Sequence, residues 1–307
     1  MFQILSVIAP LFIIIFASAL LQKFRQVGEY WSVVLNEYAL KIGLPILIFS
    51  SLAKTPFSFK AEVPLMAANS VFLLLAFLLA IIAGKILRLQ KQMFLTLFIC
   101  FGFSNIAYLG IPVLTQVMGE KIISTASLIV AVYLIWQFTL GSGFLDYLLD
   151  GNKKNIVKNL AKNFFKNPLL LAVILGIIAG AAHIAIPDVL LKSLDMINAS
   201  VMPTVLVVIG LFIGKSKIGK LAEWAPVLAF SFVTLMILPA IFYFGVKFFG
   251  FLPSQFSSSI IEAAMPLAIT PFALADKYNL NKAFIARSIV LSTILSAASL
   301  PFWISIL

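Results

Sequence analysis

The sequence predicts an all-α protein that crosses a membrane ten times and consists of two similar five-helix halves in opposite orientation. Three observations carry this prediction: a composition that is 62% hydrophobic and only 11% charged over 307 residues, long apolar runs between short charged loops, and prolines that recur at a constant spacing. Soluble domains carry about 45–50% apolar and about 25% charged residues, so the soluble class is excluded.

Ten segments have the length and apolarity of membrane-spanning helices, which need about 20 apolar residues each. They cover residues 4–22, 31–53, 63–87, 93–118, 122–145, 168–187, 190–214, 224–248, 256–276 and 283–306. The first segment is expected to remain in the protein as a helix, because no basic residue precedes it and no small-residue cleavage site follows it.

Positive charge sets the expected orientation. Of the 22 Lys and Arg residues, 16 fall in one alternate set of loops and five in the other. Basic loops stay in the cytoplasm, so ten spans place both termini outside a cytoplasmic (inner) membrane. This topology explains the net charge of +11 without a nucleic-acid partner. The middle loop, residues 150–166, alternates lysines with apolar residues and is expected to lie on the cytoplasmic lipid surface.

The two halves of the chain, residues 1–149 and 167–307, share a pattern of prolines. Corresponding prolines are 158 or 159 residues apart: Pro10 and Pro168, Pro45 and Pro203, and Pro112 and Pro271. Each half then holds five spans, and an odd number turns the second half upside down. Inverted repeats of this kind are typical of secondary transporters, which work by alternating access.

The fourth segment contains helix breakers inside an apolar run, "FGFSNIAYLGIPVL". Pro112 lacks a backbone donor and Gly110 permits an unwound backbone, so a break is expected near residues 107–112. Broken backbone at membrane depth is tolerated only where it is buried in protein or lines a wet cavity.

The ninth segment, "EAAMPLAITPF", carries the matching breakers. Pro266 and Pro271 lie five residues apart, with Thr270 beside them, and predict a second break. The two breaks are expected to cross near the membrane centre, where four half-helix ends would form a binding site.

The motif Asn-x-x-aromatic-x-Gly-x-Pro in "SNIAYLGIP" resembles the crossover motif of the auxin efflux carrier family, which includes the plant PIN proteins and bacterial dicarboxylate carriers. "IVLSTILSAASLPFW" and "NPLLLAVILG" are similar to that family's last and sixth helices. The resemblance covers essentially the whole chain. It implies a fold similar to the bile acid–sodium symporters, with helices 1, 2, 6 and 7 as a panel domain and helices 3–5 and 8–10 as a core domain.

The resemblance also implies a cation site. In the sodium-driven relatives, a Ser-Asn pair before the first break and a Glu before the second bind the ion, and Ser104, Asn105 and Glu262 match these positions. Pro266 stands where the symporters have a glutamine. Hydroxyl groups of the fifth segment would complete the oxygen shell that a hard cation prefers: Ser124, Thr125 or Ser127. Transport is expected to be coupled to sodium or protons through Glu262, or to be uncoupled and driven by the membrane potential, and no other cofactor is expected.

By the same resemblance the substrate is a small organic anion: a carboxylate, a dicarboxylate or an auxin-like weak acid. The expected binding residues lie at the crossover and in the second segment: Asn105, Tyr108, Gly110, Pro112, Pro266, Thr270, Pro271 and Lys41. Lys41 either attracts the anion or pairs with Glu37 one turn earlier. Asp195, the repeat equivalent of Glu37, is expected in a polar patch with Lys192 and Asn198 between panel and core.

A passive anion channel or uniporter, or a membrane sensor, stays open as an alternative. A channel needs a continuous polar stripe, whereas polar residues here concentrate at the crossover, which favours alternating access. An enzyme is not expected, because the sequence has one histidine and one cysteine and lacks metal and paired-aspartate motifs. Besides the substrate, the expected partners are membrane lipid and a second copy that docks through the panel.

Overall fold

The computed structural model describes residues 2–28, 30–55, 59–150, 165–216 and 220–307, and within them it contains helices and no strand. Seven helical runs in this part of the chain are long and apolar enough to cross a membrane: Ile4–Lys23, Trp31–Ala53, Glu62–Ile86, Ile122–Leu148, Asp188–Lys215, Ala225–Phe248 and Lys282–Ser305. The protein is therefore helical and polytopic. The predicted surface segment, residues 150–166, lies outside the described residues except at its ends.

The first half of the chain contains four continuous helical runs and one interrupted run. Its elements are α1 (Phe2–Lys23), α2 (Trp31–Tyr38), η1 (Ala39–Gly43), α3 (Leu44–Ala53), α4 (Phe59–Ile86), α5 (Lys91–Gly102), η2 (Ile106–Gly110), α6 (Ile111–Met118), α7 (Ile122–Trp136), η3 (Gln137–Ser142) and α8 (Gly143–Asp150). Here η1, η2 and η3 are π-helical turns that continue directly into the helix that follows.

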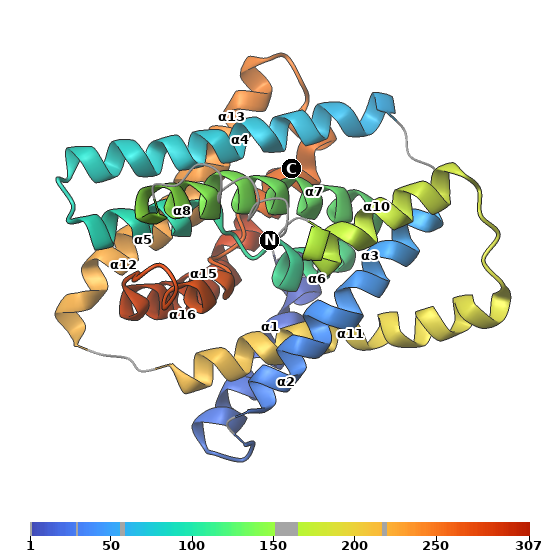
Figure 1. The fold of residues 1–307 in the computed structure, drawn as a ribbon, viewed down its shortest axis with the longest axis horizontal. Helices are drawn as coiled ribbons and strands as arrows, with labels where there is room; N and C mark the ends of the chain where they lie inside the picture. Colours follow the sequence, from blue (N-terminus) through green and yellow to red (C-terminus); the bar gives the residue numbers. More distant parts are fainter. Residues whose placement is uncertain (1, 29, 56–58, 151–164, 217–219) are drawn as a thin grey trace.

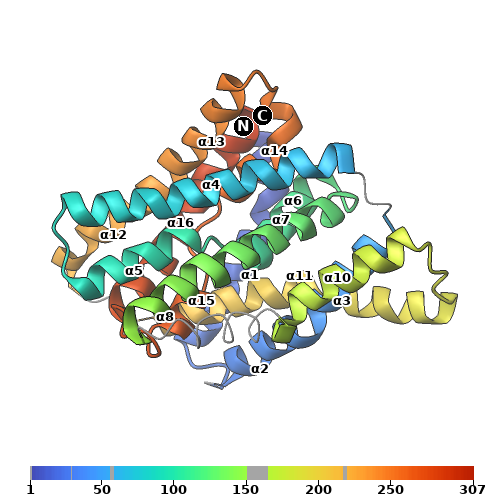
Figure 2. The ribbon, with the colours of Figure 1, turned by 45° about the horizontal axis from the view of Figure 1, so that its top comes forward.

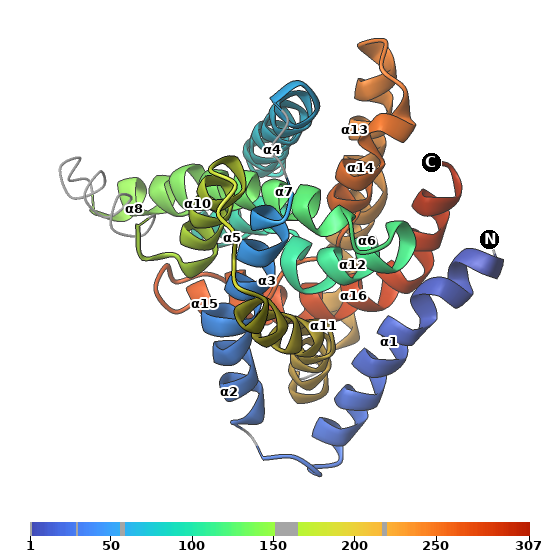
Figure 3. The same cartoon turned by 90° about the vertical axis from the view of Figure 1, so that its right-hand side faces the viewer.

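The second half begins with α10 and ends with the long helix α16. Its elements are α10 (Pro168–Ala181), α11 (Asp188–Lys215), η4 (Leu221–Trp224), α12 (Ala225–Phe232), the π-helical turn η5 (Val233–Ile237), α13 (Leu238–Phe248), η6 (Pro253–Phe256), α14 (Ser257–Ala263), α15 (Thr270–Leu274) and α16 (Lys282–Ser305). The start of α1 and the end of α16 lie close together (Figures 2 and 3).

Three of the ten predicted spans are not single long helices. One is α10, which has 14 residues. The other two are the predicted broken segments, which consist of α5 with η2 and α6, and of α14 with α15. The count of ten spans and the inverted repeat therefore stay predictions.

A proline inside a helix removes one backbone donor, and three runs of this protein absorb that loss in a π-helical turn. In each run, the residue just before the proline donates its N–H to the carbonyl five residues earlier: Leu44 to Ala39, Ile111 to Ile106, and Leu238 to Val233. The chain consequently stays helical across residues 107–112, and the break expected there is wrong in position. Instead, α5 ends at Gly102 and the backbone is non-helical over residues 103–105.

Close helix packing organises the helices in two groups. A Cβ atom on Gly210 would lie 2.2 Å from the Ile15 carbonyl oxygen, and one on Gly214 would lie 2.2 Å from the Ala19 carbonyl oxygen, so α11 packs directly on the backbone of α1. Small residues four apart allow such approach between membrane helices. In the same group α3 packs along α10 (Figure 1). The other group includes α4 with α5 and α7 (Figure 2), and α12 with α16.

Replacing Gly210 with valine is expected to lower the free energy of unfolding by about 1–3 kcal/mol, because the added side chain overlaps the α1 backbone. The measurement is thermal unfolding of the purified variant in detergent. Gly245→Ala is the matched control, since a Cβ atom there meets no atom within 4 Å. Equal melting temperatures for Gly210→Val and the unmodified protein would contradict the close packing of α1 on α11.

Candidate functional site

The two interrupted segments cross and pair through their non-helical backbones. The Asn105 N–H donates to the Pro266 carbonyl at 2.7 Å, and the Ala268 N–H donates to the Phe103 carbonyl at 2.9 Å, which is the pattern of an antiparallel bridge. Backbone groups left unpaired in lipid are costly, so these bonds allow both helices to open at membrane depth. The break predicted at Pro266 is confirmed, because residues 264–269 separate α14 from α15.

Side chains of neighbouring helices satisfy further backbone groups at the crossover. The Gln137 amide, from η3, donates to the Gly102 carbonyl at 2.9 Å, where α5 ends. The Leu267 N–H donates to the Ser292 hydroxyl of α16 at 3.1 Å. Side chains of the surrounding helices therefore stabilise the crossover in addition to the backbone bonds between its two segments.

A cavity of about 560 Å³ opens on one side of the crossover. Five of the predicted site residues line it: Lys41, Ser104, Asn105, Tyr108 and Thr270. The other predicted substrate residues do not line the cavity and lie in the packed backbone of the crossover: Gly110, Pro112, Pro266 and Pro271. A volume of this size is typical of small-molecule sites, which are about 300–1,000 Å³.

Asn105 and Tyr108 occupy the crossover wall of the cavity. The Asn105 side chain is buried, and its amide nitrogen has no hydrogen-bond partner among the described residues. The Tyr108 hydroxyl donates to the Asn36 carbonyl oxygen atom Oδ1 at 2.7 Å and so ties the crossover to α2. The sequence analysis missed Asn36, although a polar amide within an apolar span was the available signal.

The charged groups that line the cavity are all positive. They are Lys41, Lys166 and Lys277, and among the described residues no carboxylate is part of the lining. Lys41 was expected at the site, whereas Lys166 and Lys277 were not. An amide donor and three ammonium groups around one hollow can bind an anion through charge-assisted hydrogen bonds.

Glu262 is not part of the lining of this cavity and lies against Gly110 of the crossover. Its side chain is fully buried, and both carboxylate oxygens lack a hydrogen-bond partner among the described residues. A Cβ atom on Gly110 would stand 2.1 Å from Oε2 of Glu262, so the glycine makes room for the carboxyl group. The buried Tyr133 hydroxyl lies beside Ser104 and within electrostatic range of Glu262, yet makes no hydrogen bond of good geometry.

The residues around Glu262 fit a small cation in part. Two unpaired carboxylate oxygens supply charge and ligands, and Ser104 and Asn105 are nearby on the crossing strand. The hydroxyls of Ser124 and Ser127 are engaged elsewhere: they donate to carbonyls of their own helix, and Ser127 also lies 3.3 Å from the Ser51 hydroxyl. Thr125 is half-buried on the same helix. Tyr133 is the α7 hydroxyl that lies near the carboxylate.

Two predicted polar pairs take definite places. Lys41 forms an ion pair with Glu37 at 3.1 Å, and both side chains are mostly exposed, so such a pair contributes little stability. Asp195 pairs with Lys54 at 2.9 Å, and the Asn198 amide donates to the Ser50 hydroxyl at 2.9 Å. These contacts join α11 to the end of α3. The observed contacts of Asp195 and Asn198 thus lie between α3 and α11, which also pack on each other, and their expected place between panel and core stays a prediction.

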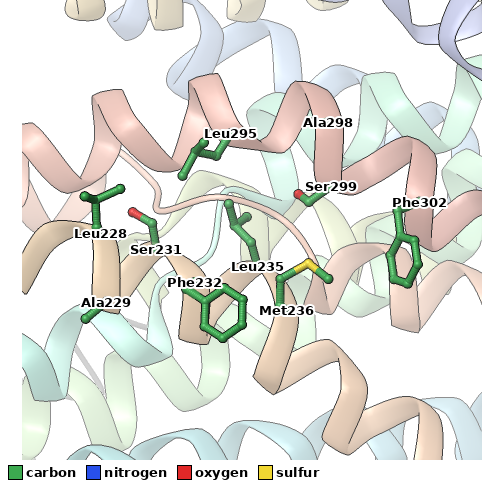
Figure 4. A pocket seen from close by; sticks show the side chains of 10 residues that line it. All are labelled: Leu228, Ala229, Ser231, Phe232, Leu235, Met236, Leu295, Ala298, Ser299 and Phe302. Atoms are coloured by element: carbon green, nitrogen blue, oxygen red, sulfur yellow. The ribbon is translucent and has the colours of Figure 1, made fainter.

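A second hollow of about 620 Å³ lies between α12, η5 and α16 (Figure 4). Its lining is apolar, with Leu228, Phe232 and Phe302 among the side chains, and it contains no charged group. Two serine hydroxyls, Ser231 and Ser299, are its polar atoms. It offers no charge for a small ion, in contrast to the lysine-lined cavity at the crossover.

Gly110→Ala is expected to lower the melting temperature, because the added methyl group displaces the Glu262 carboxyl group from its place. In a Glu262→Ala background the same change is expected to cost much less, since the colliding atoms are gone. Thermal unfolding of the two single variants and the double variant measures this coupling. Additive effects of the two substitutions would contradict the contact between Gly110 and Glu262.

Comparison with known proteins identifies the family. The profile of the family described as "Membrane transport protein" matches residues 3–304. An uncharacterized transporter of Methanocaldococcus jannaschii is 24% identical over 273 residues, which are 88% of this chain and 88% of that protein. The described structure agrees, since it combines helices long and apolar enough to span a membrane with a cavity whose lining includes polar and charged side chains. The chain belongs to the membrane transport protein family, the auxin efflux carrier family that its crossover motif predicts.

Proposed function

We propose that the protein is a secondary transporter that carries a small organic anion, a carboxylate, across the cytoplasmic membrane by alternating access. The observation that supports this most directly is the cavity at the crossover, whose described lining includes three lysines, four amide side chains and two tyrosines and no carboxylate. A cavity with this charge attracts anions and disfavours cations. It ends at a crossover of broken helices, the usual place of a substrate site in secondary transporters.

The crossover supplies the second attraction for an anion. Asn105 directly precedes the helical run that begins at Ile106. The positive end of that helix dipole therefore lies at the cavity wall. The unpartnered Asn105 amide nitrogen lies at the same place. One carboxylate of the substrate binds there, with donors that are already fixed by the backbone bonds of the crossover.

The proposed movement shifts one group of helices against the other. The helices α1, α2, α3, α10 and α11 form the panel, and the remaining helices form the core with the crossover. Hydrogen bonds between the groups are short side-chain contacts, such as Tyr108 to Asn36 and Ser51 to Ser127. In the full proposal the chain has ten spans in an inverted repeat with both termini outside. Lipid surrounds it, and a second copy docks on the panel.

The proposed coupling group is Glu262. A charge at the membrane centre costs about 2.5–3.5 kcal/mol on insertion scales, so a buried carboxylate without a partner requires a bound cation or a proton. Ser104, Asn105 and Glu262 are the proposed ligands if the ion is sodium. Because Glu262 lies against Gly110 of the crossover and Asn105 lines the cavity, one backbone crossing connects the cation and anion sites.

The anion site is tested by the Asn105→Ala variant. Four carboxylates are compared: malonate, malate, succinate and indole acetate. The melting temperature of the unmodified protein is expected to rise with the concentration of a carboxylate that binds, because a ligand that binds only the folded state stabilises it. Asn105→Ala is expected to lose most of this response. Asn198→Ala, whose amide bonds Ser50 outside the cavity, is expected to keep it. A response that survives in Asn105→Ala would contradict the proposed site.

The cation site is tested by thermal unfolding in sodium and in choline at equal ionic strength. A sodium-specific rise in melting temperature is expected, and Glu262→Gln is expected to abolish it because the neutral amide cannot balance the ion's charge. Glu120→Gln, an exposed residue near the start of α7, is the matched control. Equal melting temperatures in the two salts would argue against sodium and leave protons or the membrane potential as the driving force.

A further inference from the structure

Lys277 lies in the loop between α15 and α16 and lines the same cavity as Asn105. The loop is firmly placed: Tyr278 and Leu280 are buried, and the Asn281 N–H donates to the Thr96 hydroxyl of α5 at 2.8 Å. The Leu280 N–H closes a turn on the Ala275 carbonyl at 2.9 Å. The position of the Lys277 backbone is thus determined by packing against the core helices.

The ammonium group of Lys277 is held in one orientation by two partners. It donates to Oδ1 of Asp146 at 3.2 Å and to the Tyr278 hydroxyl at 2.5 Å, and it lies 4.3 Å from the centre of the Tyr278 ring. Asp146 comes from α8, and its side chain is only 8% exposed, whereas that of Lys277 is 56% exposed. An ammonium group has three donors, so one remains for a ligand in the cavity.

The Lys277 side chain carries a positive charge that its neighbours stabilise. Partial burial by itself lowers the pKa of this side chain, but hydrogen bonds and charge interactions with Tyr278 and Asp146 outweigh it and raise the pKa above its ordinary value. The amine therefore stays protonated at neutral pH and can pair with an anion.

The other two cavity lysines are held less firmly. Lys41 pairs with Glu37 on its own helical run, and both side chains are mostly exposed. Lys166 is exposed, and no ion pair to it occurs among the described residues. Within the described chain, Lys277 is thus the cavity lysine whose ammonium group is fixed by a different helix. Fixed donors lose less entropy when a ligand binds, so Lys277 is the better anchor.

We infer that Lys277 is a second anion-binding residue of the cavity, which binds a second carboxylate of the substrate while Asn105 and the half-helix end bind the first. This inference rests on the proposed transport of an organic anion and narrows it to dicarboxylates. A monocarboxylate of equal length satisfies one end of the cavity and leaves the other without its partner. Sites built to bond a polar group discriminate strongly against ligands that lack it.

The test compares acids of equal carbon number that differ by one carboxylate: malonate with propionate, succinate with butyrate, and glutarate with pentanoate. For each acid, the measurement is the concentration needed to raise the melting temperature of the purified protein in detergent by the same fixed amount. For the best pair, the dicarboxylate is expected to act at a concentration lower by about tenfold or more, as for one charge-assisted hydrogen bond. Lys277→Gln is expected to remove this preference and to leave the weaker response to the monocarboxylate.

Two variants make the comparison specific. Lys277→Arg keeps the positive charge and is expected to keep most of the preference. Lys282→Gln removes a lysine close by in the chain, which pairs with Asp276 at 2.6 Å and does not line the cavity, and it is expected to change neither response. Equal responses to both acids in the unmodified protein, or a preference that survives in Lys277→Gln, would overturn the role of Lys277.

The same experiment separates this inference from the proposed function. If the acids stabilise the protein through Asn105 but Lys277→Gln changes nothing, the inference fails and the anion site stands. If Lys277→Gln weakens both acids of a pair equally, the lysine does not recognise the second carboxylate and the inference also fails. If no acid stabilises the unmodified protein, or Asn105→Ala does not alter the response, the proposed function fails and the inference fails with it.

Discussion

The requirement that backbone amides stay paired in lipid governs the centre of this protein. Two helices are open there, and the bonds from Asn105 to Pro266 and from Ala268 to Phe103 replace the helical bonds that are lost. Without this pairing, opening either helix in the membrane would leave backbone N–H and carbonyl groups without hydrogen-bond partners. Because the bonds lie in the backbone, they fix the crossover regardless of which side chains surround it. The side chains on its two sides are therefore available for binding.

The crossover contacts two different environments. The cavity has three lysines in its lining, and outside that lining Glu262 is buried against Gly110 with Tyr133 nearby. In the proposed transporter, an anion in the cavity and a cation at Glu262 would both contact the paired backbone segments of the crossover. Opposite charges in a low-dielectric interior stabilise each other more than they would in water. This arrangement supplies the physical basis for coupling in the proposed transporter.

The sequence predicts the helical membrane class and the two interrupted segments, because composition and paired prolines act locally. It does not predict where the fourth segment opens. Pro112 indicates only that one backbone donor is missing. The π-helical turn before Pro112 compensates for that loss, and the helix is open instead at residues 103–105. Lys166 and Lys277 were missed for another reason. They lie in loops, where basic residues also set orientation, and only the fold shows that these loops reach the cavity.

In the proposed mechanism, the anchors of the substrate belong to both groups of helices. Asn105 and Lys277 are part of the core, whereas Lys41 and Lys166 are part of the panel or directly precede its helix α10. A shift of core against panel therefore keeps the first pair with the substrate and separates it from the second. Contacts of exposed lysines are weak and screened, so breaking them costs little. Asn105 and Lys277 thus move together with the bound anion, whereas Lys41 and Lys166 separate from it.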